Sequence, residues 1–214
     1  MIETLALKKK RASDIYALLK STYENASSPL NYYHPHELLI ANILLPQCTY
    51  TQVNTVTKKL YKKYQSIIDF AYCNLQSLES DVDRIENYKQ KAQYIKQACS
   101  IIIDNYKSVL PVSHDELLRL PGIETDSANM MLSEIYNIPS VILNDHIMRI
   151  VKLLKLTRND DLIKIRADIA EIFEQKIWAK VTYLIAKHGE QICIEIKPKC
   201  EKCILNKLCP SSSV

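Results

Sequence analysis

Residues 120–130, LPGIETDSANM, are the stretch that decides the fold class of this chain. They contain Gly122, one of only two glycines among the 214 residues, and it directly follows a proline. A Pro-Gly pair is typical of a tight turn, and the residues after it repeat apolar side chains at helical spacing. The stretch therefore predicts a hairpin between two helices, HDELLRL (114–120) and DSANMMLSEIY (126–136).

The hairpin raises a question because of its charge. Turns that lead into a helix often hold a phosphate, since backbone N–H groups point outward there. This turn carries the acidic residues Glu124 and Asp126, whereas a turn that grips phosphate should be neutral or basic.

The composition favours a helical protein that is compatible with nucleic acid. Hydrophobic residues make up 47% of the chain, which is enough for a sizeable core. Two glycines are few for sheets joined by tight hairpin turns, so an all-α fold is expected. The net charge of +4 permits binding to nucleic acid without requiring it.

Apolar periodicity predicts helices along most of the chain. The segment 36–45 is apolar nearly all round, as a central core helix would be. Further helices are expected over 14–26, over 77–88, and from Asp161 to about His188. No signal peptide or membrane-spanning stretch is recognised, so we expect a cytoplasmic protein that works beside DNA.

Four of the seven cysteines lie close together near the C-terminus. Their spacing is C-x6-C-x2-C-x5-C, and seven cysteines in a cytosolic chain indicate metal binding more than disulfides. Four thiolates on a short loop can ligate zinc or an iron–sulfur cluster, and the spacing alone leaves both open. The predicted ligands are Cys193, Cys200, Cys203 and Cys209.

These features together resemble the endonuclease III branch of the helix-hairpin-helix DNA glycosylases. The resemblance covers roughly residues 36–209, and the cysteine spacing combined with the hairpin is specific. The positions that carry it are Gln47, Val53-Asn54, Lys91-Ala92, Leu120-Pro121-Gly122, Ala128-Asn129, His146, His188-Gly189, Lys197-Pro198-Lys199 and the four cysteines.

The resemblance implies a fold, a cofactor and a partner. The fold would be all-α and two-lobed, with a [4Fe–4S] cluster in the C-terminal loop, and the protein would bind double-stranded DNA as a monomer. Residues 1–30 would pack with the cluster lobe, 31–140 would form the central lobe with the hairpin, and 141–214 would hold the C-terminal helices and the loop. The implied DNA contacts are Gln47, Asn87, Gly122, Thr125, His146, Lys197 and Lys199.

The chain departs from the family where the chemistry should be. Members with lyase activity carry a lysine two residues before the position of Ala128, and this chain has Asp126 there. A carboxylate cannot form a Schiff base with the sugar. The family's catalytic aspartate lies two residues before His146, where this chain has Asn144. Asp145 is one residue along, and a rotation of ~100° along a helix should point it elsewhere.

Three more positions differ in the segments expected to handle DNA. Glu124 and Thr125 replace a glycine and a basic residue of the hairpin, and Asn87 stands where the family has a leucine wedge. Three hypotheses follow. The protein binds DNA in base excision repair with lost or altered chemistry; it is an active monofunctional glycosylase that uses Asp126 or an activated water; or it is a redox or protein-interaction module on a retired repair fold.

Overall fold

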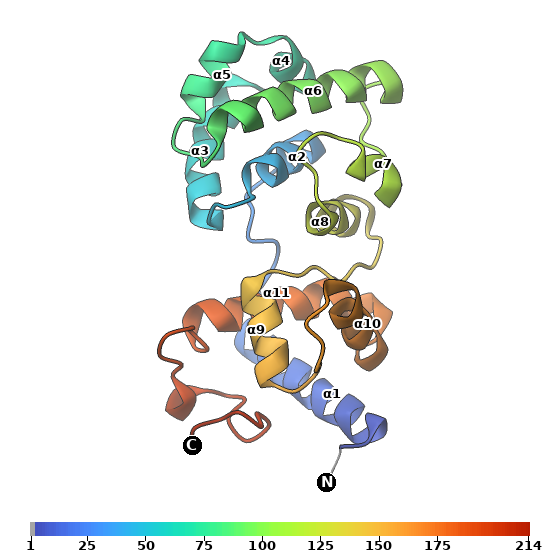
Figure 1. The fold of residues 1–214 in the computed structure, drawn as a ribbon, viewed down its shortest axis with the longest axis vertical. Helices are drawn as coiled ribbons and strands as arrows, with labels where there is room; N and C mark the ends of the chain where they lie inside the picture. Colours follow the sequence, from blue (N-terminus) through green and yellow to red (C-terminus); the bar gives the residue numbers. More distant parts are fainter. Residues whose placement is uncertain (1–2) are drawn as a thin grey trace. The chain divides into compact units, whose positions relative to one another are not determined.

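The structure is a computed structural model that describes residues 3–214. Within this range every regular element is a helix and no strand occurs, as the composition predicted. The backbone contacts divide the chain into two compact units (Figure 1). Unit 2 runs from Ser28 to Ile138, and unit 1 combines the segment up to Ser27 with Pro139–Val214.

Unit 2 is built around the helix α2 (Pro35–Leu44). Every residue from Glu37 to Leu44 is buried, which confirms the prediction of a central core helix. This helix packs against α3, α6 and α8, while α4 and α5 pack against α6 (Figure 1). The bounds of the others are α3 (Tyr50–Lys63), α4 (Ile67–Tyr72), α5 (Leu75–Asp81), α6 (Tyr88–Tyr106), α7 (His114–Leu118) and α8 (Thr125–Tyr136).

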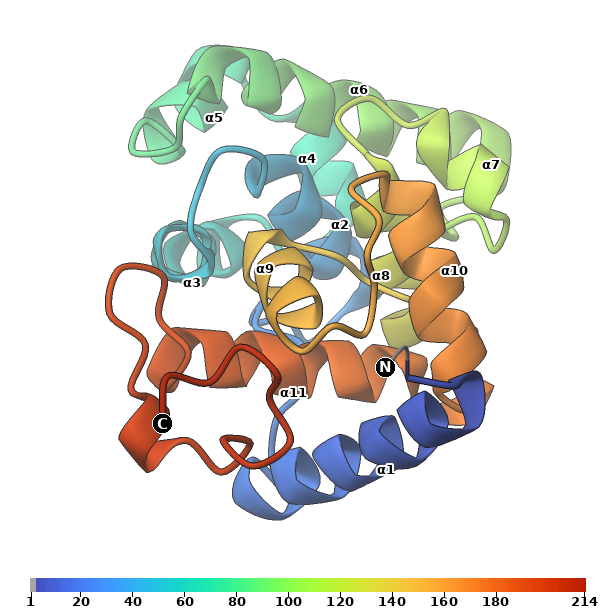
Figure 2. The same ribbon diagram turned by 60° about the horizontal axis from the view of Figure 1, so that its bottom comes forward.

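Unit 1 is built around α11 (Trp178–Gln191), which packs against α1 and α9. In Figure 2 the C-terminal segment turns back from the end of α11, and its residues contact α1 and α9. Arg11 of α1 bonds to the Leu208 carbonyl, and the Cys209 thiol donates to the Leu153 carbonyl of α9. The other elements are α1 (Leu5–Thr22), α9 (Asp145–Leu153), α10 (Leu162–Ile172) and the 3-10 helices η1 (Gln175–Ile177) and η2 (Cys200–Lys202).

Three predicted helices have different bounds from those expected. The first helix begins at Leu5 because Thr4 accepts a hydrogen bond from Leu7 N and caps it. The helix expected over 77–88 ends at Asp81, and a turn follows before α6. The long run after Asp161 is broken at Phe173, whose backbone is extended, and the Trp178 ring N–H donates to its carbonyl at 3.0 Å.

Within residues 3–214, none of the helices has the length and apolar character needed to span a membrane.

Candidate functional site

The predicted hairpin is present in unit 2 as α7, a tight turn and α8. Gly122 in the turn has φ of +80°, a left-handed conformation that favours glycine. A Cβ there would lie 2.9 Å from Tyr94 Cδ2 and 3.0 Å from Ile43 Cγ2. The turn therefore packs directly on α2 and α6, and the absence of a side chain is what permits this close approach.

The residues that come after the turn of the hairpin, Glu124, Thr125 and Asp126, lie at the start of α8. Glu124 is the N-cap residue and is exposed, while Thr125 and Asp126 are half-buried in the first turn. Negative side chains in this position stabilise a helix through its dipole. The acids thus favour folding of the hairpin, and they give the start of α8 a negative charge.

Gln47 and Asn87 lie together although 40 residues separate them in the sequence. Asn87 Nδ2 donates to Gln47 Oε1 at 2.8 Å, and both residues are exposed. Beneath them, Lys91 is only 5% exposed and its Nζ donates to the carbonyls of Leu44 and Pro46. Burial lowers the pKa of Lys91.

Asn144 and His146 lie at the start of α9 in unit 1. Asn144 is the N-cap, and its Oδ1 accepts a hydrogen bond from Ile147 N at 2.9 Å. Asp145 is exposed at the first helical position. A Cβ added to Gly189 of α11 would lie 3.1 Å from His146 Cβ, so α11 fits closely against this end of α9. The substitution of asparagine for aspartate keeps the cap and removes the charge.

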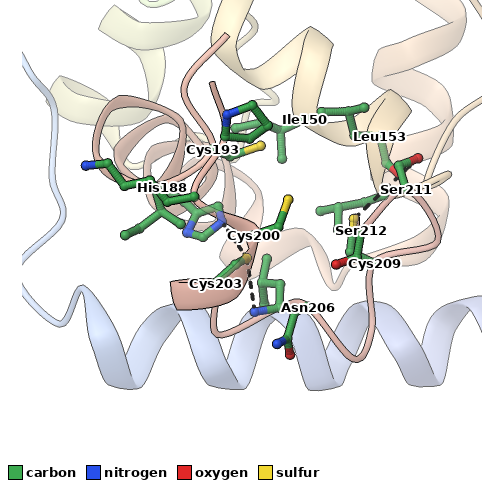
Figure 3. A pocket seen from close by; sticks show the side chains of 15 residues that line it. Ile150, Leu153, His188, Cys193, Cys200, Cys203, Asn206, Cys209, Ser211 and Ser212 are labelled. Atoms are coloured by element: carbon green, nitrogen blue, oxygen red, sulfur yellow. Dashed lines mark hydrogen bonds between the residues drawn. The ribbon is translucent and has the colours of Figure 1, made fainter. Parts of the chain in front are cut away.

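All four predicted cysteine ligands line a single pocket of unit 1, and their sulfur atoms converge on it (Figure 3). Leu153 and Ile150 of α9 and His188 of α11 form its walls. The cavity volume is about 70 Å³, several times the ~10–15 Å³ that one water-sized sphere needs. The pocket therefore has room for a group of several atoms.

Each of the four sulfur atoms is close to hydrogen-bond donors. Arg149 Nη1 lies 3.6 Å from Cys193 Sγ, and the His188 ring Nε2 lies 3.4 Å from Cys203 Sγ. Leu205 N donates to Cys203 Sγ at 3.4 Å. Hydrogen bonds from Ser213 and Ser212 lower the pKa of Cys200, and one from the Ser211 backbone acts in the same direction on Cys209. Donors around sulfur are what thiolate ligands require.

His188 is the most buried of these donors, at 2% exposure. Burial lowers its pKa to about 4, so the ring is neutral at pH 7 and has one N–H. The Tyr23 hydroxyl lies 3.1 Å from Nδ1, and a tyrosine that donates there leaves the proton on Nε2, facing Cys203 (Figure 3).

Burial affects two of the four cysteine thiols. Burial raises the pKa of Cys203 and of Cys209, so their thiolates need a positive group to balance them. Yet across residues 3–214 no three His, Cys, Asp or Glu side chains are near enough to one another to hold one metal ion.

Lys197 and Lys199 are both exposed in the loop between Cys193 and Cys200. Lys199 N bonds to the Ile192 carbonyl at 3.0 Å, and its Nζ bonds to the Gln191 carbonyl at 3.1 Å. The loop is thus closed at its base, beside the end of α11.

Sequence reasoning missed the residues that support these sites. Arg149, Tyr23 and the serines 211–213 surround the cysteines, and none belongs to a recognisable motif. Arg11 bonds to Glu3, Leu154 and Leu208. A lone basic or hydroxyl side chain gives no sequence signal for such contacts, which join residues 44 positions apart for Arg149 and Cys193 and 165 positions apart for Tyr23 and His188.

Comparison with known proteins places these features in context. Residues 40–175 match the model of the HhH-GPD superfamily base excision DNA repair proteins. The chain is 34% identical to endonuclease III of Synechocystis sp. over 99% of this chain and 97% of that protein. It is 30% identical to endonuclease III of Bacillus subtilis over 87% of this chain and 86% of that protein.

Comparison with solved structures also finds similarity to endonuclease III. The structure of a non-covalent endonuclease III–DNA complex matches with a TM-score of 0.90 and 30% identity, over 99% of this chain and 97% of that one. A thermostable thymine-DNA glycosylase matches with a TM-score of 0.82 at 19% identity, over 95% and 97%, and this likeness concerns the fold alone.

Proposed function

This chain belongs to the endonuclease III-like family of base excision DNA repair proteins, and on that premise we propose that it binds double-stranded DNA and performs no Schiff-base lyase chemistry. DNA binding is supported by the similar proteins solved as endonuclease III–DNA complexes. The observation that carries the second part is the carboxylate of Asp126 in the first turn of α8.

A Schiff base requires an unprotonated amine that can reach the sugar. The side chains of Thr125, Asp126 and Ser127 at the start of α8 offer none. Lys91 has a lowered pKa, but it is buried and its Nζ is bonded to two backbone carbonyls. We therefore expect no covalent adduct between the wild-type protein and abasic DNA.

The neutral side chain of Asn144 affects what we expect for the step that breaks the bond between the base and the sugar. Charge that develops on the sugar as a base leaves is stabilised by a carboxylate. The Asn144 amide is neutral, and its oxygen is engaged in capping α9. Removal of such a charge costs ~10²–10⁴ in rate, so base excision by the family's usual route should be very slow.

A hydrolytic activity that uses Asp126 is the second candidate. The position of Asp126 favours it, because it places a carboxyl group in the first turn of the 12-residue helix α8, where the family's lyase members carry their lysine. Such a carboxylate could activate a water as general base. A single-turnover assay separates the candidates on duplexes with an oxidised pyrimidine, uracil or thymine opposite guanine, adenine opposite 8-oxoguanine, or an abasic site. Release of a base without strand cleavage, abolished by Asp126→Asn, would establish hydrolysis.

In unit 2 we propose a DNA grip formed by the hairpin turn at Gly122 and Thr125 together with Gln47 and Asn87. In unit 1 we propose separate DNA contacts from His146, Lys197 and Lys199. Glu124 weakens this grip, since an exposed carboxylate at the helix start repels a phosphate. We expect Glu124→Gly to raise duplex affinity several-fold at low salt and to steepen the salt dependence. Fluorescence anisotropy at a series of salt concentrations measures this. If the protein showed no salt-dependent binding to the duplex, this result would instead support the hypothesis of a redox or protein-interaction module that does not bind DNA.

We propose a [4Fe–4S] cluster as the cofactor, held by Cys193, Cys200, Cys203 and Cys209; the proposal is supported by the position of all four cysteines around one pocket. When bound, such a cluster supplies a metal–sulfur cross-link that couples metal binding to folding of the segment. The donors from Arg149, His188 and the serines 211–213 would then stabilise the thiolates, and the closed loop would present Lys197 and Lys199 to DNA.

A further inference from the structure

Three side chains of unit 1 form a row of hydrogen bonds that ends on one of the four cysteines. His188 Nε2 lies 3.4 Å from Cys203 Sγ (Figure 3), and the Tyr23 hydroxyl lies 3.1 Å from His188 Nδ1. Tyr23 is the C-cap residue of α1, and His188 lies in the last turn of α11. The end of one helix therefore reaches the cysteine pocket through the side chain of another.

The direction of both hydrogen bonds follows from the chemistry of a metal-bound sulfur. A cysteine that ligates a metal is a thiolate and has no proton to donate, so His188 Nε2 must be the donor to Cys203. The His188 ring is 2% exposed, and burial of this degree favours a neutral ring, which has a single N–H. Nδ1 is then an acceptor, and the Tyr23 hydroxyl that faces it donates.

The His188 ring is held in place on every side that the contacts describe. Its backbone carbonyl accepts from Ile192 N and from Cys193 N, both at 2.9 Å, at the start of the cysteine loop. The Tyr23 ring meets the imidazole edge to face, with 6.0 Å between the ring centroids and an angle of 62° between the planes. The N–H that points at Cys203 therefore has a fixed position, and the Tyr23 hydroxyl is the group that decides which nitrogen carries it.

We propose that Tyr23 is a positioning residue whose hydroxyl fixes the His188 N–H on the Cys203 sulfur and so raises the reduction potential of the metal group held by the four cysteines. This inference rests on the proposed [4Fe–4S] cofactor. Hydrogen bonds to the sulfurs are among the factors that set the potential of such a group, because a donor stabilises the extra negative charge of the reduced state. Without the hydroxyl, the ring proton can move to Nδ1, and Nε2 then turns a lone pair toward the sulfur.

The experiment measures the midpoint potential of the full chain with its cluster bound, in the absence of DNA. We expect the equilibrium constant for reduction to fall about tenfold in Tyr23→Phe, which is a shift of ~59 mV to lower potential for a one-electron couple. Phenylalanine keeps the ring that packs against His188. Tyr16→Phe is the matched control on the same helix and the same core, and its constant should stay within about twofold of wild type.

A second substitution tests whether Tyr23 acts through His188. His188→Gln offers an amide N–H₂ to Cys203, and this donor needs no hydroxyl to fix its proton, so adding Tyr23→Phe to it should leave the potential unchanged. If His188→Gln does not retain the cluster, the comparison of Tyr23→Phe with Tyr16→Phe decides alone. An unchanged potential in Tyr23→Phe, or a shift that persists in the His188→Gln background, would overturn this inference and leave the cofactor intact. A wild type that contains no iron and no acid-labile sulfide would overturn the proposed cofactor and this inference together.

Discussion

The cysteine pocket of unit 1 and the hairpin of unit 2 differ in how the side chains predicted to be functional are held. The cysteine sulfurs are surrounded by donors from α9, α11 and the C-terminal segment. In the hairpin, the packing depends on Gly122, which lies against Tyr94 and Ile43, while Glu124 is exposed and Asp126 is half-buried. A change of one cysteine should therefore disturb many contacts, whereas the chemistry at the hairpin can be altered without loss of the fold.

The largest effect is expected from removal of a cysteine ligand. Cys203→Ser should reduce the bound iron from about four atoms per chain to less than about one, since a four-thiolate site rarely survives loss of a ligand. Iron and acid-labile sulfide analysis of the purified protein measures this. Cys73→Ser is the matched control, because Cys73 is half-buried but lies in α4's C-cap, outside the pocket.

Two outcomes would contradict this part of the account. If the purified wild type contained zinc instead of iron, the proposed iron–sulfur cluster would be wrong. Equal iron in Cys203→Ser and Cys73→Ser would show that Cys203 is not a ligand.

The two glycines allow a direct comparison of packing in the two units. Gly189→Ala places a Cβ 2.8 Å from Ile150 Cδ1, and Gly122→Ala combines a φ of +80° with a contact of 2.9 Å to Tyr94. Each should lower the free energy of unfolding by ~1–3 kcal/mol. Chemical denaturation followed by circular dichroism measures both, with Lys187→Ala, an exposed position of α11, expected within ~0.5 kcal/mol of wild type.

The visible absorption of the bound cluster then distinguishes the two variants. Gly189→Ala should weaken cluster retention, because its clash lies on α9 and α11, which line the pocket. Gly122→Ala should retain the cluster. If Gly122→Ala lost the cluster and Gly189→Ala retained it, cluster retention would depend on the hairpin more than on the helices that line the cysteine pocket.

A smaller effect on the free energy of unfolding is expected at Asn144. This residue caps α9 and also stands at the position that we propose to matter for base excision. Asn144→Ala removes the cap of α9 and should cost about 1 kcal/mol of unfolding free energy, while Asn144→Asp should stay within a few tenths, since both side chains cap helices well. Thermal and denaturant unfolding compare the variants. Equal destabilisation by alanine and aspartate would argue that the amide nitrogen, rather than Oδ1, matters at this position.

The sequence was sufficient for the helical fold, the hairpin and the central burial of α2, because glycine placement and apolar periodicity are local signals. It failed where structure depends on distant contacts. The break at Phe173 lies within a continuous apolar pattern, and it becomes visible only when the Trp178 ring bonds to the Phe173 carbonyl. The Gln47–Asn87 contact has the same cause, since no local pattern relates residues 40 positions apart.

Our central claim is that the hairpin keeps its fold and has exchanged the side chain needed for lyase chemistry. Borohydride trapping on an abasic duplex tests it directly, with wild type beside the double variant Asp126→Lys/Asn144→Asp at concentrations where both bind the duplex. We predict no trapped adduct for the wild type and a covalent protein–DNA adduct for the double variant. A wild-type adduct as abundant as that of the double variant would show that another amine performs the reaction, and would contradict the account.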